Sequence, residues 1–202
     1  FAREEFDRVG ASNVVTVPLG VDLDQFHPRH RSATVRAQWA GPGQTLLVHC
    51  GRLSIEKHPH RSIDAVATLC DSGVDARLVV VGEGPLRSRL QRQARGLPVD
   101  FTGYVGCRET VAAILASADV ALAPGPHETF GLAAAESLLR GLPVVASANE
   151  GVPEVLADGR AGALVAPGDA PALAAADALI DIPADVVELA VGDGVDVLAL
   201  DD

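Results

Sequence analysis

The 202-residue sequence contains no methionine, a single lysine and few aromatic residues, which make up 3% of the chain. A natural polypeptide normally begins with methionine, so a chain that opens on Phe1 is expected to be a piece of a longer one. No apolar run approaches the ~20 residues needed to span a bilayer, and no signal peptide is recognisable. The hydrophobic share of 48% and the charged share of 21% argue against a disordered, collagenous or membrane-spanning chain and are typical of one soluble domain.

Cysteine is also scarce, with three residues at Cys50, Cys70 and Cys107, and an odd number cannot pair completely within one chain. Their spacing does not resemble that of a zinc site. Because thiols are kept reduced in the cytosol, we interpret them as reduced, mostly buried thiols of a cytoplasmic protein. The inner face of the cell membrane is the alternative location.

Positive charge is outnumbered: 16 Lys and Arg residues stand against 27 Asp and Glu residues, which gives a net charge of -11. The imbalance is uneven, because residues 161–202 contain nine acidic residues and no basic one. A chain without a basic run does not offer the electrostatic footprint that duplex nucleic acid or anionic lipid would need. We therefore predict no nucleic-acid partner.

Short apolar runs rich in Val and Ala alternate with stretches of helical period, and this pattern predicts an α/β fold with a doubly wound parallel sheet. The predicted strands are 14–17, 45–50, 76–81, 99–102, 120–123, 143–146 and 163–165. The predicted helices are 33–39, 60–71, 85–94, 108–117, 131–140, 152–157 and 170–180. The strands lack apolar–polar alternation, so helices are expected on both faces of the sheet. Residues 182–202 are expected to form either an extra strand or a disordered acidic tail.

In doubly wound sheets, ligands bind outside the carboxyl ends of the strands, which directs attention to the glycine-bearing turns after them. The first such turn runs from Gly51 to Lys57 and also contains Arg52. An arginine can grip two oxygens in a fork and a lysine adds a compact charge, so this pair suits a diphosphate. The alternative is two solvated surface cations beside Glu56. The position of the turn, and the fact that Lys57 is the only lysine, favour the diphosphate.

A second candidate segment is PGPHETFGLAAAE, from Pro124 to Glu136. A strand ends there in a rigid turn, and the next helix opens at Gly131, where backbone N–H groups can approach a phosphate closely. Carboxylates are good acceptors for sugar hydroxyls, so Glu128 and Glu136 fit a ligand that is part phosphate and part polyol. For Glu128 the alternative is a favourable acid near a helix N-terminus. An unpaired Glu136 among Ala and Leu would be costly to bury, which favours a ligand.

Four segments in this order, GRLSIEKH, GEGP, FTGYV and ETFGLAAAE with its two glutamates separated by seven residues, resemble the donor-binding half of retaining GT-B glycosyltransferases of the GT4-type family. The similarity continues through PLGVDLDQFHP, GLPVVAS, GVPEVL and GALVAPGD. The sequence of the segment PGPHETFGLAAAE is most similar to that of actinobacterial mannosyltransferases that use GDP-mannose. The resemblance implies one half of a two-domain GT-B fold, with a Rossmann-like domain at 14–181. Residues 1–13 would end a missing N-terminal domain or form an interdomain segment, and 182–202 would be an atypical acidic tail.

The resemblance also implies a role for each matched position. Arg52 and Lys57 hold the donor diphosphate at the Gly51 turn and stabilise the departing nucleotide, a role that a metal plays in other transferases, so no metal cofactor is implied. Glu128 contacts hydroxyls of the donor sugar, and Glu136 contacts those of the ribose. The remaining donor-binding positions are Tyr104 and Val105 at the nucleobase, Phe130, Gly131 and Leu132 near the phosphate and sugar, and His127, which either lies near the sugar or shapes its loop.

The implied function is transfer of a hexose, with mannose favoured, from a nucleotide-diphosphate sugar to a glycolipid or glycan acceptor. GDP-mannose is the favoured donor and a UDP-sugar is the alternative. Because the family's N-terminal half contributes the acceptor site, this chain alone is expected to bind the donor weakly and to show little transfer. Peripheral membrane contact is expected only of the full-length enzyme. The competing hypothesis is a catalytically incompetent fragment that serves as a binding or interaction module.

Overall fold

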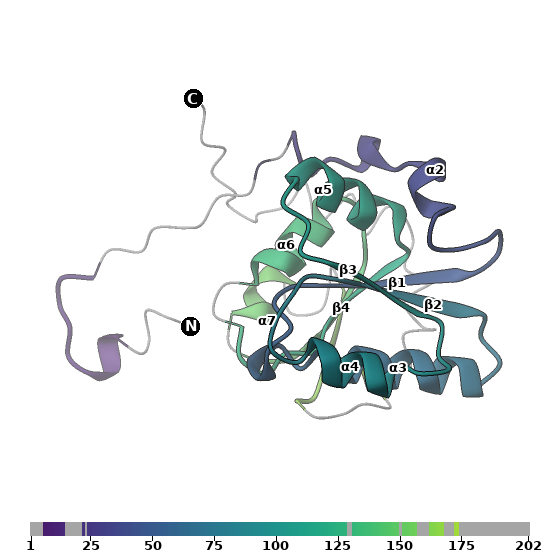
Figure 1. The fold of residues 1–202 in the computed structure, drawn as a ribbon. Coiled ribbons are helices and arrows are strands. Elements are labelled where there is room, and N and C mark those ends of the chain that lie inside the picture. The colour runs from purple at the N-terminus through teal and green to yellow at the C-terminus, as the bar shows by residue number, and fades with distance from the viewer. Residues whose placement is uncertain are drawn as a thin grey trace.

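The structure is a computed structural model that describes residues 6–14, 22, 24–128, 131–149, 151–156, 162–167 and 172–173. Within these ranges, six strands form one sheet in the order β3-β2-β1-β4-β5-β6, and every neighbouring pair is parallel (Figure 1). The strands are β1 (Thr45–Cys50), β2 (Ala76–Val81), β3 (Val99–Gly103), β4 (Val120–Ala123), β5 (Val144–Ser147) and β6 (Gly162–Val165). This strand order is the one found in dinucleotide-binding Rossmann folds.

Helices cover both faces of the sheet, as the continuous apolar strands predict (Figure 1). The helices are α2 (Ala33–Arg36), α3 (Pro59–Asp71), α4 (Arg87–Gln93), α5 (Arg108–Ser117), α6 (Leu132–Leu138) and α7 (Val152–Val155), with the 3-10 turns η1 (Pro28–His30) and η2 (Ile55–Lys57). Helices α3 and α4 pack on one face, against alternate residues of β1 and β2 such as Leu47 and Leu78. Helices α5 and α6 pack on the other face, against Leu46 and Val79. Each buried Leu or Val side chain contributes roughly 1.5–3 kcal/mol. The same apolar strands supply such side chains to both helical layers.

The strand order has a switch point between β1 and β4, where the chain changes the side on which it adds strands. After β1 it adds β2 and β3 on one side, and α5 then returns it to β4 on the other side of β1. Two loops therefore diverge at the carboxyl ends of β1 and β4, and the crevice between them is where such sheets bind ligands. The loop after β1 contains Lys57, and the loop after β4 contains Glu128.

The predicted strands agree closely with the observed ones. Strands 45–50, 76–81 and 120–123 have the predicted bounds, and β3, β5 and β6 differ by one residue at one or both ends. The predicted strand 14–17 and helix 170–180 fall largely outside the described residues, and the domain bounds at 14–181 stay a prediction.

The helices predicted at 33–39, 85–94, 131–140 and 152–157 are shorter than expected, and for the first and third the local reason is clear. The helix predicted at 33–39 ends at Arg36, because the next turn is closed by hydrogen bonds of the 3-10 type, between residues three apart. Gln38 N donates to Val35 O (3.1 Å) and Trp39 N donates to Arg36 O (2.9 Å). The helix predicted at 131–140 begins at Leu132 and ends at Leu138. Its predicted first residue, Gly131, has a φ of 65°, in the left-handed region that favours glycine, and so precedes the helix.

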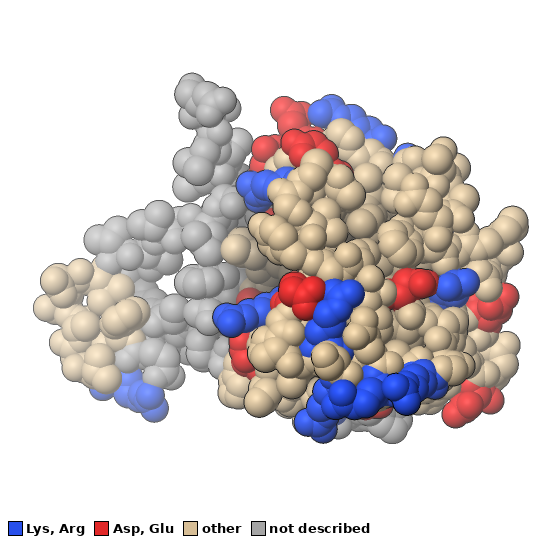
Figure 2. All heavy atoms as spheres, viewed as in Figure 1, with Lys and Arg blue, Asp and Glu red and all other residues tan. Residues whose placement is uncertain are grey.

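The net negative charge does not extend over the whole surface. Figure 2 shows Lys and Arg side chains gathered in a band along the lower edge of one face, where Figure 1 places α3 and α4. Helix α4 alone contains three arginines in seven residues, and Arg95 follows it. The charge of the chain is therefore a poor guide to the local potential on this face.

Candidate functional site

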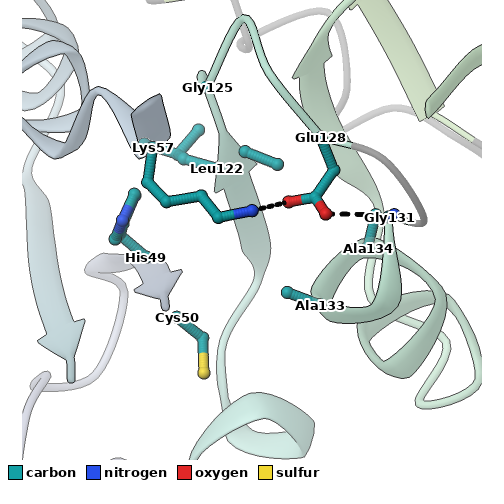
Figure 3. A pocket seen from close by; sticks show the side chains of 10 residues that line it. His49, Cys50, Lys57, Leu122, Gly125, Glu128, Gly131, Ala133 and Ala134 are labelled. Carbon is teal, nitrogen blue, oxygen red and sulfur yellow. Dashed lines mark hydrogen bonds and ion pairs between the residues drawn. The ribbon is translucent and has the colours of Figure 1, made fainter. Parts of the chain in front are cut away.

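An open pocket with about 370 Å³ of empty space lies at the carboxyl ends of β1 and β4 (Figure 3). It is lined by His49, Cys50, Lys57, Leu122, Ala123, Gly125, Glu128, Gly131, Ala133 and Ala134. These residues come from β1, the η2 turn, β4 with its loop, and α6. The pocket therefore coincides with the position at which the strand order predicts a ligand.

Lys57 is positioned by a tight local turn. It is the last residue of η2, where its backbone N–H donates to Ser54 O (3.3 Å), and Ser54 Oγ donates to the Glu56 carboxylate (2.6 Å). The next residue, His58, has a φ of 45° and is the one non-glycine residue with a positive φ in the described ranges. Pro59 then begins α3. A side chain held in the left-handed region is costly, and such residues concentrate at functional sites, where they fix a required chain path.

Glu128 lies on a loop that is tied down at three points. Ser147 Oγ donates to Pro124 O (2.9 Å), the Asn149 side-chain amide donates to Pro126 O, and Gly151 N donates to Glu128 O (3.3 Å). The loop also presses against the Lys57 turn. A Cβ added at Gly125 would lie 2.8 Å from Glu56 O and 3.0 Å from Lys57 Cα, so only glycine permits this approach.

The two loops meet in an ion pair between Lys57 Nζ and Glu128 Oε2 (Figure 3). The other carboxylate oxygen of Glu128 accepts a hydrogen bond from Gly131 N (3.2 Å), at the start of α6. The side chains of Lys57 and Glu128 are 30% and 22% exposed, so the pair is shielded but still reachable from solvent. Cation, carboxylate and helix N–H thus form one polar centre in a pocket whose other walls are mostly apolar.

Among the lining residues that were not predicted from sequence, His49 and Cys50 are the two with titratable side chains. His49 is 3% exposed, its Nδ1 lies 2.9 Å from Ser62 Oγ, and its Nε2 has no hydrogen-bond partner among the described residues. Burial, with the charge of Lys57 as a second cause, lowers the pKa of His49 to about 4. Burial likewise raises the pKa of Cys50 to about 12, with Glu136 as the second cause. A histidine at the end of an apolar strand, directly before the Gly51 turn, was the available signal.

Glu136 lies apart from the pocket lining, on α6, in a cluster with two arginines and an aromatic ring. Its carboxylate is 3.7 Å from Arg108 Nη2, and its side chain is 20% exposed. Burial raises the pKa of Glu136, although Arg108 and Arg140 oppose that effect. Both guanidinium groups lie over the Phe26 ring, with Cζ of Arg108 at 5.7 Å and Cζ of Arg140 at 4.7 Å from the ring centroid. Glu136 is therefore not left unpaired among Ala and Leu residues, and its contact with a ligand stays a prediction.

Among the predicted site residues, the structure brings Lys57, Glu128 and Gly131 together as lining of the pocket. The others lie around its rim or farther away. Gly51 begins the turn. Arg52 is exposed, its backbone carbonyl accepts from Ser54 N (2.9 Å), and its guanidinium forms no hydrogen bond or ion pair with a described residue. Tyr104 is 81% exposed, Leu132 is 39% exposed, His127 is exposed, and Val105 packs against the core. Phe130 lies outside the described residues.

The described residues contain neither a metal-binding cluster nor a membrane-spanning helix. No group of three or more His, Cys, Asp and Glu side chains in these ranges is arranged to hold a metal ion. None of the helices found there is long and apolar enough to cross a membrane. The three cysteines are all free, but the expectation that they are mostly buried is wrong, because Cys50 and Cys70 are partly exposed and Cys107 is exposed.

Fold and pocket together define a Rossmann-like domain whose charged centre lies at the switch point of the sheet. The family model described as "Glycosyl transferases group 1" matches residues 44–182, and the chain belongs to this family of enzymes.

Individual relatives agree with this assignment. The chain is 69% identical, over 77% of its length and 41% of the relative's, to the GDP-mannose-dependent alpha-(1-6)-phosphatidylinositol dimannoside mannosyltransferase of Mycobacterium tuberculosis. It is 36% identical to the sulfoquinovosyl transferase SQD2 of Arabidopsis thaliana, over 74% of this chain and 29% of that one. The chain thus spans about two fifths or less of the length of these curated relatives.

Solved structures show the same fold. Anabaena HepE, crystallised with UDP and glucose, has a TM-score of 0.80 at 23% identity, over 94% of this chain and 54% of that one. Sucrose-phosphate synthase of Thermosynechococcus elongatus has a TM-score of 0.73 at 27% identity, over 93% of this chain and 49% of that one. Each match covers about half of a GT-B glycosyltransferase, so the predicted α/β, Rossmann-like fold is confirmed.

Proposed function

We propose that this chain is the donor-binding domain of a retaining glycosyltransferase and that its donor is a nucleotide-diphosphate hexose, with GDP-mannose favoured over a UDP-sugar. The observation that carries the proposal is the meeting of Lys57 and Glu128 at the switch point of the sheet. It sets a cation suited to a diphosphate beside an acid suited to sugar hydroxyls. The name of the M. tuberculosis relative supports GDP-mannose as donor and a mannosylated phosphatidylinositol as acceptor.

In the proposed reaction, the bond between the anomeric carbon and the diphosphate breaks, and negative charge grows on the departing nucleotide. Lys57 in the pocket and the exposed Arg52 of the same turn supply the positive charge that stabilises it, in place of a divalent cation. Glu128 orients the sugar through its hydroxyls, and Glu136 accepts from the ribose. Tyr104 and Val105 border the base, while His127, Phe130, Gly131 and Leu132 shape the loop around sugar and phosphate.

The complete reaction also needs an acceptor site, which we assign to an N-terminal GT-B domain outside this chain. The lipid named in the mycobacterial relative supports a reaction at a membrane surface, and we propose its cytoplasmic face. Binding of the donor, rather than transfer, is therefore the property to test in these 202 residues.

Calorimetric titration with GDP and with UDP, at concentrations up to the millimolar range, tests donor binding directly. We expect GDP to bind weakly, with or without a chelator of divalent cations. Lys57→Ala should weaken GDP binding by about 30-fold or more, because a charge-assisted contact to the diphosphate is lost. Arg95→Ala, on the surface beyond the far end of α4, is the matched control and should leave the affinity unchanged. Failure of a folded sample to bind either nucleotide would sink the proposal.

A further inference from the structure

The carboxylate of Glu128 occupies Lys57, one of the two cations that the proposed function assigns to the diphosphate, and also a backbone N–H of the same pocket. One oxygen pairs with the Lys57 ammonium, and the other accepts from Gly131 N at 3.2 Å (Figure 3). A phosphate oxygen would pair with the same ammonium. The side chain of Glu128 therefore stands where an anionic ligand would have to bind.

The position of this carboxylate is built into the fold. Hydrogen bonds from Ser147 and Asn149 fix the backbone of its loop, and Gly125 is wedged against the Lys57 turn. The loop backbone therefore has little room to withdraw, and a ligand must move the Glu128 side chain itself. That side chain is 22% exposed, so a carboxylate displaced from Lys57 would be left partly buried without its cation.

We infer that Glu128 acts as an internal competitor for the diphosphate and thereby makes the site discriminate a nucleotide sugar from the nucleotide alone. This inference rests on the proposed function. A nucleoside diphosphate displaces Glu128 from Lys57 and offers it nothing in return. A nucleotide sugar also displaces it, but its hydroxyls donate new hydrogen bonds to the freed carboxylate. Glu128 therefore weakens product binding more than donor binding, which favours product release after transfer.

Titration of Glu128→Gln with GDP and with GDP-mannose tests this difference. The amide removes the competing charge, so we expect GDP to bind about tenfold more tightly than to the parent chain. GDP-mannose should gain little, since it loses its strong carboxylate acceptor at the same time. The dissociation constant of GDP divided by that of GDP-mannose should therefore fall by about an order of magnitude.

Two further variants separate the contact from the charge. Glu56→Gln removes a carboxylate next to Lys57 in sequence that is bonded to Ser54 Oγ instead, so it should change GDP affinity by less than about twofold. Glu128→Asp keeps the charge but shortens the reach, so it should also bind GDP more tightly. If Glu56→Gln tightened GDP binding as much as Glu128→Gln, general electrostatics would explain the effect and the inference would be wrong.

Lys57 supplies an independent readout, because it is the only lysine in the chain. Labelling with 13C,15N-lysine gives one side-chain signal, which should move when GDP displaces Glu128. In ligand-free Glu128→Gln the signal should already differ from that of the parent chain, and GDP should still shift it. An unchanged ligand-free signal would overturn the inference while leaving the proposed function intact. Absence of GDP binding by every variant would instead overturn the proposed function.

Discussion

The two glutamates of the site, Glu128 and Glu136, are buried to a similar degree but are paired very differently. Their side chains are 22% and 20% exposed. Glu128 is held by the Lys57 ammonium and a backbone N–H, whereas the nearest cation to Glu136 is Arg108 at 3.7 Å. Burial raises the pKa of Glu136. Partners rather than burial therefore decide how ready a carboxylate is for a ligand: Glu128 must first be released from Lys57, while Glu136 is held by the longer contact to Arg108.

The surroundings of the two glutamates differ in the same way. At the Lys57 end, contacts between neighbouring residues and between two adjacent loops fix the geometry. At the Glu136 end, the ring of Phe26 contacts Arg108 and Arg140, which are more than 80 residues away in sequence. The first end is a compact, preformed polar centre, and the second depends on long-range packing of a preceding segment.

Acid should destabilise the fold through His49, which lies at the Lys57 end of the site, and this is the largest effect that we expect. In the unfolded chain an imidazole takes up its proton near pH 6.5, while burial lowers the pKa of His49 in the fold to about 4. Between these values the unfolded state binds the proton and the folded state does not. The contribution of His49 should therefore reduce the free energy of unfolding by roughly 3 kcal/mol as the pH falls from 7 to 4, with no change above pH 7.

Urea unfolding at several pH values measures this loss. His49→Gln, which cannot titrate, should remove that part of the slope, whereas His30→Gln, at an exposed histidine, should retain it. Equal slopes in the parent chain and in His49→Gln would show that His49 is not the titrating group.

Glu136→Gln sharpens the comparison at the other end. Removal of the charge relieves the burial penalty, so the free energy of unfolding should stay within about 0.5 kcal/mol of the parent value or rise. GDP should bind about tenfold more weakly, because an amide oxygen is a poorer acceptor for ribose hydroxyls. This is opposite in sign to the effect expected of Glu128→Gln.

Titration with 2′,3′-dideoxy-GDP provides the control for Glu136→Gln. A ligand without these hydroxyls should bind the parent chain and the variant equally well. If Glu136→Gln weakened both ligands to the same extent, the carboxylate would not contact the ribose.

Most of the fold could be predicted from the sequence because its signals are local. Continuous apolar runs such as 45–50 and 76–81 identify buried strands, and a glycine after most of them identifies the turns. Helix ends were less predictable, because they depend on backbone conformation. The left-handed conformation of Gly131 moved the start of α6 by one residue, and three-residue hydrogen bonds ended α2 early.

Three of the residues that line the pocket, Lys57, Glu128 and Gly131, were among those predicted from the sequence, but their contacts were not. The positions of Lys57 and Glu128 follow from the ends of β1 and β4, yet their ion pair joins residues 71 positions apart, and no local pattern encodes it. The same holds for His49, whose sequence neighbours are those of an ordinary buried strand and whose proximity to Lys57 results from the path of the next turn.

Arg108→Ala should have the smallest effect and tests whether Glu136 is loosely held. The Arg108 side chain is 65% exposed and lies 3.7 Å from Glu136, and exposed pairs of this kind contribute little to stability or affinity. We expect GDP affinity to change by less than about twofold in titration, with an unchanged melting temperature. A tenfold change in either direction would mean that Arg108 governs Glu136 as Lys57 governs Glu128. Both carboxylates would then belong to the same kind of competing ion pair, and the contrast between the two ends of the site would disappear.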